Sequence, residues 1–185
     1  MEGKHPIVLD PVGIGATSYR RKKIKELTGE VKFDLIRCNQ EEALVLLSGS
    51  PKASGGVESA LSLPEKDIRE LATDLALKYD TVAYISGKID AISDGKRFEI
   101  VDGGSPLIKR ITGGGCMLSA LCAMYLAAEP DCFLAALAAG TLWRLAAAKA
   151  EKVTNAGKGG IGTFYTGLFD AVDELSGSPG KGVYL

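Results

Sequence analysis

Three consecutive glycines and a cysteine, Gly113 to Cys116, stand where a polar segment gives way to an uncharged run with helical character. Glycine in the first turn of a helix costs about 1 kcal/mol relative to alanine. The free N–H groups of a helix start and the positive end of its dipole attract anions. The segment fits neither G-x-G-x-x-G nor G-x-x-x-x-G-K-[ST]. It predicts an anion-binding turn of another kind, and the alternative is a flexible turn into a core helix.

Cys116 falls in the first turn of that predicted helix, where the dipole favours a thiolate and a polar role. Residue type alone leaves a buried thiol as an equal alternative. Cys122 and Cys132 lie in apolar helical runs and are interpreted as packing residues. With Cys38 they make four irregularly spaced cysteines, without C-x-x-C and beside a single histidine, His5. A zinc site therefore has too few candidates, and reduced thiols are expected.

Two acids and an arginine are expected at the ends of predicted strands. Asp10 ends an apolar run, and Glu42 falls in the first turn of a helix that Asn39 can cap. Two carboxylates at one sheet edge can hold hydrated Mg²⁺, although Glu42 can equally be an acid that stabilises the helix dipole. Arg37 can bind a phosphate with its planar guanidinium, and a surface salt bridge is the alternative.

The elements that must position these residues alternate along the chain. Strands are predicted over 6–10, 33–39 and 81–87, a hairpin over 91–104, and helices over 18–29, 40–49, 63–79, 131–152 and 162–177, with another opened by 113–116. Strands alternating with helices predict an α/β fold, a mostly parallel sheet flanked by helices. The hairpin around Asp94 and Gly95 can form an antiparallel edge. Ligands are expected at the carboxyl ends of the parallel strands.

The length and the amino-acid composition predict one globular domain over 1–185. Within it, a Gly/Ser loop is predicted over 50–59 and a loose tail over 177–185. Hydrophobic residues make up 46% of the chain and the net charge is −1, so a core is expected and a basic binding face is not. Nucleic acid and membranes are therefore not expected partners. The longest uncharged run, 111–128, contains three glycines and is predicted to be a buried helix. No leader segment is recognised, and a cytoplasmic protein is expected.

Several segments taken together resemble the hydroxyethylthiazole kinase family, which has the ribokinase-like fold. The matching stretches, in the order that the family has them, are PIVLDPVGIGATSYR, IRCNQEEALVLLSG, GGVES, YISGKID, DG, ITGGGCMLSALCAMY and GIGTFYTGLFDAV. They extend across nearly the whole chain. Most ribokinase-like kinases carry aspartate after the glycine-rich turn, as the base that activates the acceptor alcohol. Thiazole kinases have cysteine in place of that aspartate, and this chain resembles them in having Cys116 at the position.

The resemblance implies transfer of the ATP γ-phosphoryl group to the hydroxyl of 4-methyl-5-(2-hydroxyethyl)thiazole in thiamine salvage, with Mg²⁺. The amides of Gly113, Gly114 and Gly115 would receive charge on the transferring group, and Cys116 would lie beside the substrate hydroxyl. The other implied roles are ATP contact for Arg37 and Ser86, support of the phosphate–metal cluster for Asn39, magnesium binding for Asp10 and Glu42, and thiazole contact for Gly113.

Three positions depart from the family pattern: Gly114 replaces threonine or serine, Cys38 replaces glycine, and Ser86 replaces threonine. The family also carries strands and helices ahead of the segment matched by 6–10, and these complete the thiazole pocket across a trimer boundary. Because the sequence begins at that segment, the resemblance implies a chain lacking these N-terminal elements. It would act as a homotrimer or in complex with an upstream fragment.

Two alternatives accompany this interpretation. The first is a non-catalytic member of the same family that binds nucleotide or supports assembly. The second is another ribokinase-like enzyme, such as a hydroxymethylpyrimidine kinase or an NAD(P)H-hydrate dehydratase. Aspartate is expected at position 116 in both of these enzymes, so Cys116 argues against the second alternative.

Overall fold

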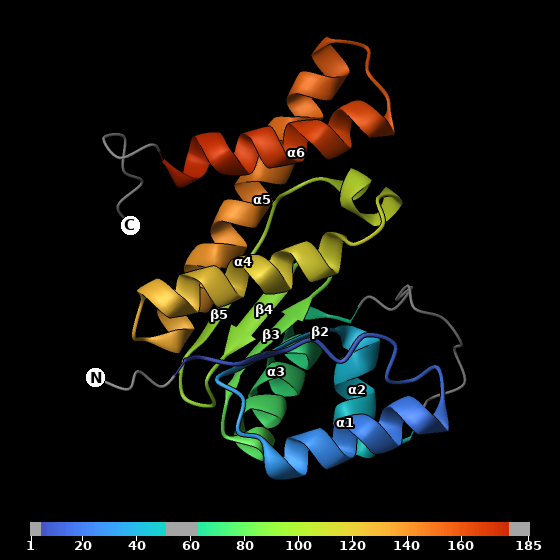
Figure 1. The fold of residues 1–185 in the computed structure, drawn as a ribbon, viewed down its shortest axis with the longest axis vertical. Helices are drawn as coiled ribbons and strands as arrows, with labels where there is room; N and C mark the ends of the chain where they lie inside the picture. Colours follow the sequence, from blue (N-terminus) through green and yellow to red (C-terminus); the bar gives the residue numbers. More distant parts are fainter. Residues whose placement is uncertain (1–4, 51–62, 178–185) are drawn as a thin grey trace.

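The computed structural model describes residues 5–50 and 63–177, and within them five strands form one sheet in the order β1-β2-β3-β4-β5 (Figure 1). The strands are β1 (Val8–Leu9), β2 (Leu35–Asn39), β3 (Val82–Ser86), β4 (Asp90–Ser93) and β5 (Phe98–Val101). β1, β2 and β3 run parallel, whereas β4 and β5 are antiparallel to their neighbours. The predicted parallel sheet with a hairpin at its edge is confirmed.

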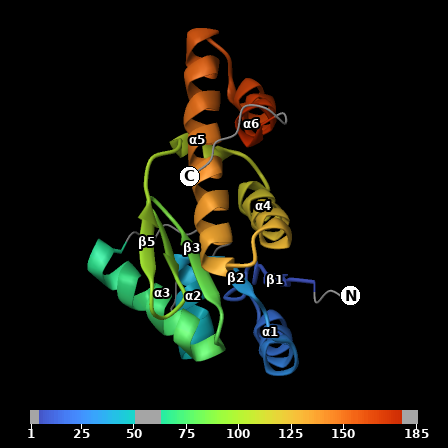
Figure 2. The same ribbon diagram turned by 90° about the vertical axis from the view of Figure 1, so that its left-hand side faces the viewer.

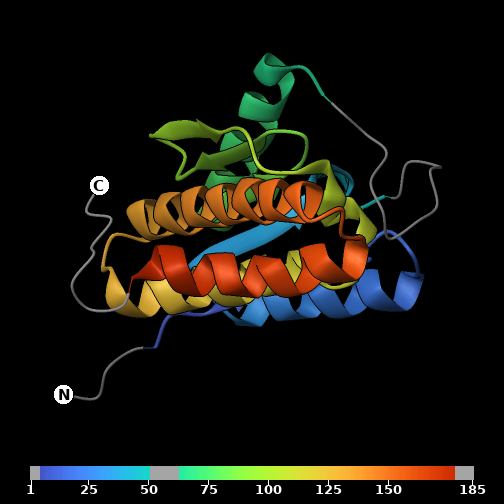
Figure 3. The same cartoon turned by 90° about the horizontal axis from the view of Figure 1, so that it is seen from above.

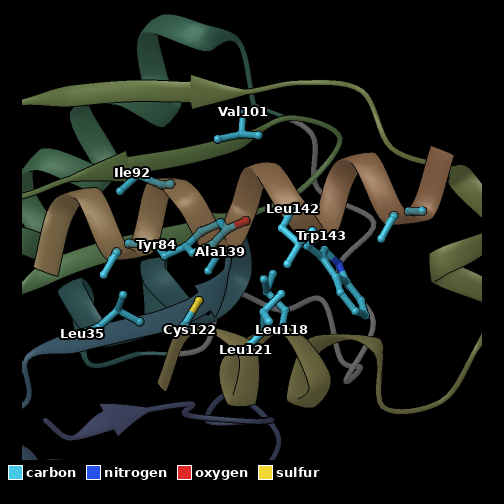
Figure 4. Packing of buried hydrophobic residues seen from close by; sticks show 14 of the residues in the cluster. Leu35, Tyr84, Ile92, Val101, Leu118, Leu121, Cys122, Ala139, Leu142 and Trp143 are labelled. Carbon is cyan, nitrogen blue, oxygen red and sulfur yellow. The ribbon is translucent and has the colours of Figure 1, made fainter. Parts of the chain in front are cut away.

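Helices cover both faces of this sheet (Figure 2). α4 (Gly114–Ala128) and α5 (Cys132–Ala156) pack on one face, and α2 (Gln40–Ser48) and α3 (Glu65–Tyr79) pack on the other. Successive strand residues point to opposite faces, so Leu35 and Tyr84 join the α4–α5 side while Ile36 joins the α2–α3 side. Figure 4 shows Leu35 and Tyr84 among the α4 and α5 side chains.

Three further elements lie outside these layers. α6 (Ile161–Ser176) packs along α5 (Figure 3), α1 (Ser18–Glu30) has no buried residue, and the short 3₁₀ helix η1 (Pro106–Arg110) precedes α4. η1 was not predicted. Within the described residues α5 alone is long and apolar enough to cross a membrane, but half of that stretch is buried. Because α5 packs against α4, α6 and three strands, it serves here as a core helix.

The Asn39 cap that the sequence indicates is confirmed, and the structure shows further helix caps. The Asn39 side chain accepts from the Glu42 N–H at the start of α2, and the Asp131 side chain accepts from two N–H groups at the start of α5. Gly49 ends α2 in the left-handed region, with φ 73°. These local signals fix where each helix begins or ends because they satisfy backbone groups that the helix itself leaves unpaired.

Some boundaries differ from the prediction. β1 is two residues long instead of the five predicted over 6–10, since proline at positions 6 and 11 provides no N–H for a ladder. α1 continues through Gly29 and ends at Glu30. The predicted Gly/Ser loop and the predicted tail lie almost entirely in 51–62 and 178–185, outside the described residues.

Candidate active site

Parallel strands end at one edge of the sheet, and four of the predicted site residues meet there. Asp10 follows β1, Arg37 and Asn39 lie in the last half of β2, and Ser86 ends β3. Asn39 and Ser86 are direct neighbours in the β2–β3 register. The first turn of α4 faces the same edge, because Ser119 and Gly115 of α4 contact Asp10 and Arg37. The sheet order thus brings Asp10, Arg37 and the helix that begins with the glycine-rich turn together.

Arg37 links two strands through its guanidinium group. Its Nη2 donates to Ser86 Oγ at 2.5 Å, and its Nη1 lies 3.5 Å from Asp10 Oδ2. The side chains of Arg37 and Asp10 are only 11% and 15% exposed, so water screens this pair weakly. Ser86 Oγ in turn donates a hydrogen bond to the Cys38 carbonyl at 3.3 Å. The guanidinium is therefore held in one orientation at the sheet edge.

Asp10 has one engaged and one unengaged carboxylate oxygen. Oδ2 accepts from Ser119 Oγ at 2.7 Å, while Oδ1 is buried and has no hydrogen-bond partner within the described residues. Arg37 Nε is unpartnered in the same way. Buried polar atoms without partners are rare in folded proteins, and a catalytic role or a bound ion is among the explanations for them. The unpartnered acceptor, Asp10 Oδ1, and the unpartnered donor, Arg37 Nε, therefore belong to two side chains that contact each other.

Glu42 has both oxygens engaged by the backbone. Oε1 accepts from the Gly13 N–H at 2.8 Å, Oε2 accepts from the Asn39 N–H at 2.9 Å, and the Glu42 N–H donates to Asn39 Oδ1 at 2.9 Å. This reciprocal arrangement is a capping box. Burial raises the pKa of the Glu42 carboxyl, and the two backbone hydrogen bonds oppose that shift. Glu42 thereby ties the turn after β1 to the start of α2, and Asn39 is engaged in the same cap.

The glycine-rich turn presents unpaired backbone donors. Gly113 caps α4 in the left-handed region, with φ 86° and no side-chain cap, a conformation that favours glycine. The first N–H to find an acceptor is that of Met117, which donates to the Gly113 carbonyl at 2.9 Å. Within the described residues, no hydrogen bond is made by the N–H groups of Gly114, Gly115 or Cys116. These are the donors that a helix start offers to an anion.

Gly115 also explains how α4 comes so close to Arg37. A Cβ added at position 115 would collide with Arg37 Nη1, and it would lie 3.1 Å from Cζ. Glycine here lets the guanidinium lie directly against the first turn of the helix. The Arg37 guanidinium and the free amides of α4 therefore lie next to each other at this edge of the sheet.

The cysteines differ sharply in their surroundings. Cys116 is exposed in the first turn of α4, whereas Cys38 and Cys122 are buried. Burial raises the pKa of the Cys38 thiol well above its usual value and that of Cys122 to about 12, so both stay protonated. Within the described residues, no group of three or more His, Cys, Asp or Glu side chains is placed to hold a metal.

Two features of this region were not predicted from the sequence. The first is the hydroxyl of Ser119 on Asp10. The second is a buried ion pair between Asp90 and Arg144, which also holds the backbone of Gly87, Lys88 and Gly103. The available signals were polar residues, Ser119 and Arg144, inside otherwise apolar helices. Their partners lie 109 and 54 positions away along the chain, and no local pattern identifies them.

Comparison with known proteins shows to which family the chain is similar. A model of the hydroxyethylthiazole kinase family matches residues 1–178. A hydroxyethylthiazole kinase of Listeria monocytogenes (serotype 4a, strain HCC23) is 44% identical over 146 residues, which are 79% of this chain and 53% of that protein. One of Haemophilus influenzae (strain PittEE) is 39% identical over 172 residues, covering 92% of this chain and 63% of the relative. The chain therefore spans between half and two thirds of the length of these relatives.

Solved structures agree on the fold. The hydroxyethylthiazole kinase protein of Pyrococcus horikoshii superimposes with a TM-score of 0.76 at 29% identity, covering 93% of this chain and 61% of that one. A Staphylococcus aureus pyridoxal kinase in complex with AMP-PCP and pyridoxal gives 0.57 at 19% identity, covering 80% and 53%, a likeness of fold alone. The predicted ribokinase-like fold is confirmed. With the family match across 178 residues, these likenesses show that the chain belongs to the hydroxyethylthiazole kinase family.

Proposed function

We propose that the protein transfers the γ-phosphoryl group of ATP to the hydroxyl of 4-methyl-5-(2-hydroxyethyl)thiazole, a step of thiamine salvage. Family membership supports the reaction type. The observation that carries the proposal is the free amide cluster at the start of α4, which lies beside Arg37, with Asp10 held to the same helix by Ser119. Phosphoryl transfer depends mainly on positioning and charge stabilisation, and this region offers both.

The chain's own donors would act on the phosphate oxygens. The amides of Gly113, Gly114 and Gly115 would receive the charge that develops on the transferring group, as preorganised donors do in an oxyanion hole. Arg37 would bind ATP phosphates, with Ser86 fixing its guanidinium and contributing to the ATP contact. Gly113, exposed at the rim of the turn, would also contact the thiazole.

Mg²⁺ is the cation that the reaction class implies, and its fit rests on the acids at the sheet edge. Mg²⁺ is usually held by one or two carboxylates together with waters and substrate phosphates, so the lack of a larger acidic cluster is no obstacle. Asp10 fits best, because its Oδ1 is buried and unpartnered. Glu42 would act through the backbone that it holds, or through remaining lone pairs on its oxygens. When bound, Mg²⁺ would neutralise charge between the β- and γ-phosphates.

Cys116 would lie beside the substrate hydroxyl. It is exposed in the first turn of α4, next to the amides that would receive the phosphoryl group. Because the transition state is loose and needs little covalent assistance, a neutral group can suffice at this position. Assembly as a homotrimer or with an upstream fragment, and residence in the cytoplasm, remain predictions that light scattering and fractionation can test.

The proposal is tested by incubating the purified protein with Mg-ATP and the thiazole alcohol, and by detecting the phosphorylated thiazole by mass spectrometry. Arg37→Lys keeps the charge but loses the planar fork, so product formation should fall about 10- to 100-fold, the loss of a charged hydrogen bond. Arg69→Lys on α3, which lies over the Phe98 ring, is the matched control and should retain activity. Tight Mg-ATP binding without thiazole-dependent product would instead identify a non-catalytic nucleotide-binding member.

A further inference from the structure

Ser119 occupies an unusual place for a helix serine. It lies one turn beyond Gly115 on α4, is 9% exposed, and points at the carboxylate that follows β1. A serine within a helix commonly donates to the carbonyl four residues earlier, and Gly115 O is available at 3.2 Å. Asp10 Oδ2 is nearer, at 2.7 Å, and is charged. Since the hydroxyl has a single proton, the stronger charge-assisted bond to Asp10 takes it.

This hydrogen bond decides which oxygen of Asp10 stays available. Ser119 and Arg37 Nη1 both approach Oδ2, whereas Oδ1 is buried and has no partner within the described residues. Arg37 Nη1 stands at 3.5 Å, longer than an ordinary charged hydrogen bond. If the serine hydroxyl were absent, the carboxylate would be free to rotate and to pair directly with the guanidinium. Oδ1 would then no longer be kept apart from the guanidinium, while the bond from Arg37 Nη2 to Ser86 would remain.

We propose that Ser119 is a positioning residue: it holds Asp10 Oδ2 so that Oδ1 is left without a protein partner and can serve the hydrated cation of Mg-ATP. The inference rests on the proposed function, because it assigns Ser119 a task in that same site. Ser119 also joins Asp10 to the helix that begins with the glycine-rich turn. The acid and the amide cluster are thereby kept at a fixed separation.

The test compares Ser119→Ala with Ser119→Thr by calorimetric titration of Mg-ATP and, separately, of ATP with EDTA. Alanine fits the space and is a good helix former, so the fold is retained. Ser119→Ala should weaken Mg-ATP binding about 10-fold, the usual effect of losing a charged hydrogen bond, and should leave metal-free ATP binding within about 2-fold. Ser119→Thr keeps the hydroxyl and should restore most of the affinity. Ser176→Ala, at the exposed end of α6, is the matched control.

The outcomes separate this inference from the proposed function. A wild-type protein that binds no Mg-ATP contradicts the proposed function and this inference with it. If the wild type binds Mg-ATP and Ser119→Ala binds equally well, only the positioning role is overturned. A Ser119→Ala variant that loses ATP binding to the same extent with and without Mg²⁺ would make Ser119 a structural residue, and that result also overturns it.

Discussion

Replacing Arg144 by methionine should strongly destabilise the protein, because this arginine is the centre of a buried polar network. Arg144 Nε donates to Asp90 Oδ2 at 2.8 Å and Nη2 donates to Asp90 Oδ1. The remaining guanidinium hydrogens reach the carbonyls of Gly87, Lys88 and Gly103. Arg144 and Asp90 are 8% and 2% exposed. The pair therefore connects α5 to the β3–β4 turn and to the loop after β5 through direct hydrogen bonds.

The magnitude follows from what Arg144→Met leaves behind. Asp90 would keep only the Tyr84 hydroxyl at 2.8 Å and the Gly87 N–H at 3.0 Å as donors. A buried carboxylate that loses its ionic partner destabilises a protein by about 3–5 kcal/mol, a large part of a typical unfolding free energy of about 5–15 kcal/mol. Adding Asp90→Asn to Arg144→Met removes the stranded charge. The double variant should therefore be less destabilised than the sum of the single ones, by about 1–3 kcal/mol.

Urea unfolding followed by far-UV circular dichroism measures these differences. Lys66→Met removes an exposed helix pair with Glu70, at 4.0 Å, and is the control, with an expected change within about 0.5 kcal/mol. The reasoning is refuted if Arg144→Met costs less than about 1 kcal/mol, the value of a surface ion pair. It is also refuted if the effects of Arg144→Met and Asp90→Asn simply add.

Two further predictions concern a close contact and a surface charge. Gly115→Ala should weaken Mg-ATP binding about 10-fold, since its Cβ would displace the Arg37 guanidinium. Gly162→Ala, with open space around it in α6, should not, and equal affinities in titration calorimetry would contradict the assigned contact. The Arg97 hydrogen bonds lower the pKa of Asp131 to about 2, so this carboxylate stabilises the fold above its ordinary pKa of 3.8 and stops doing so as pH falls through about 2. Asp131→Asn keeps the cap but loses the charge, so its free energy of unfolding in urea should be lower than that of the wild type. This difference should shrink between about pH 5 and pH 2, and a difference that stays constant over this range would contradict the prediction.

The sequence predicted the layers of this fold because they depend on local signals. Successive positions in β2 send Leu35 and Ile36 to opposite faces, and the caps Asn39 and Asp131 satisfy backbone groups of their own helices. Such features are encoded within a few residues. The ends of an element were predicted less accurately where two local signals disagree. In β1 the apolar pattern predicts a longer strand, but the flanking prolines shorten it.

The site could be predicted only as a set of residue types at one sheet edge. Strand ends place Asp10, Arg37 and Ser86 together once the strands are parallel and adjacent in the order β1-β2-β3. Which atoms then pair depends on contacts that no local pattern encodes: Gly13 with Glu42 across 29 positions, and Arg37 with Ser86 across 49. Glu42 illustrates the difference. Its place three residues after Asn39 predicts a cap, but only the fold reveals that its other oxygen holds the turn after β1.

The same reasoning explains why one acid is the better candidate for a cation. Asp10 and Glu42 are alike in sequence terms, since both are carboxylates near strand ends. In the fold, Glu42 gives each oxygen to a backbone N–H, whereas Asp10 is restrained through Oδ2 alone and keeps Oδ1 free of any partner within the described residues. A buried acceptor without a donor is costly, and a phosphate-bound cation would offset that cost. The distribution of hydrogen bonds, more than the number of acids, therefore favours Asp10 over Glu42 for the cation of the proposed reaction.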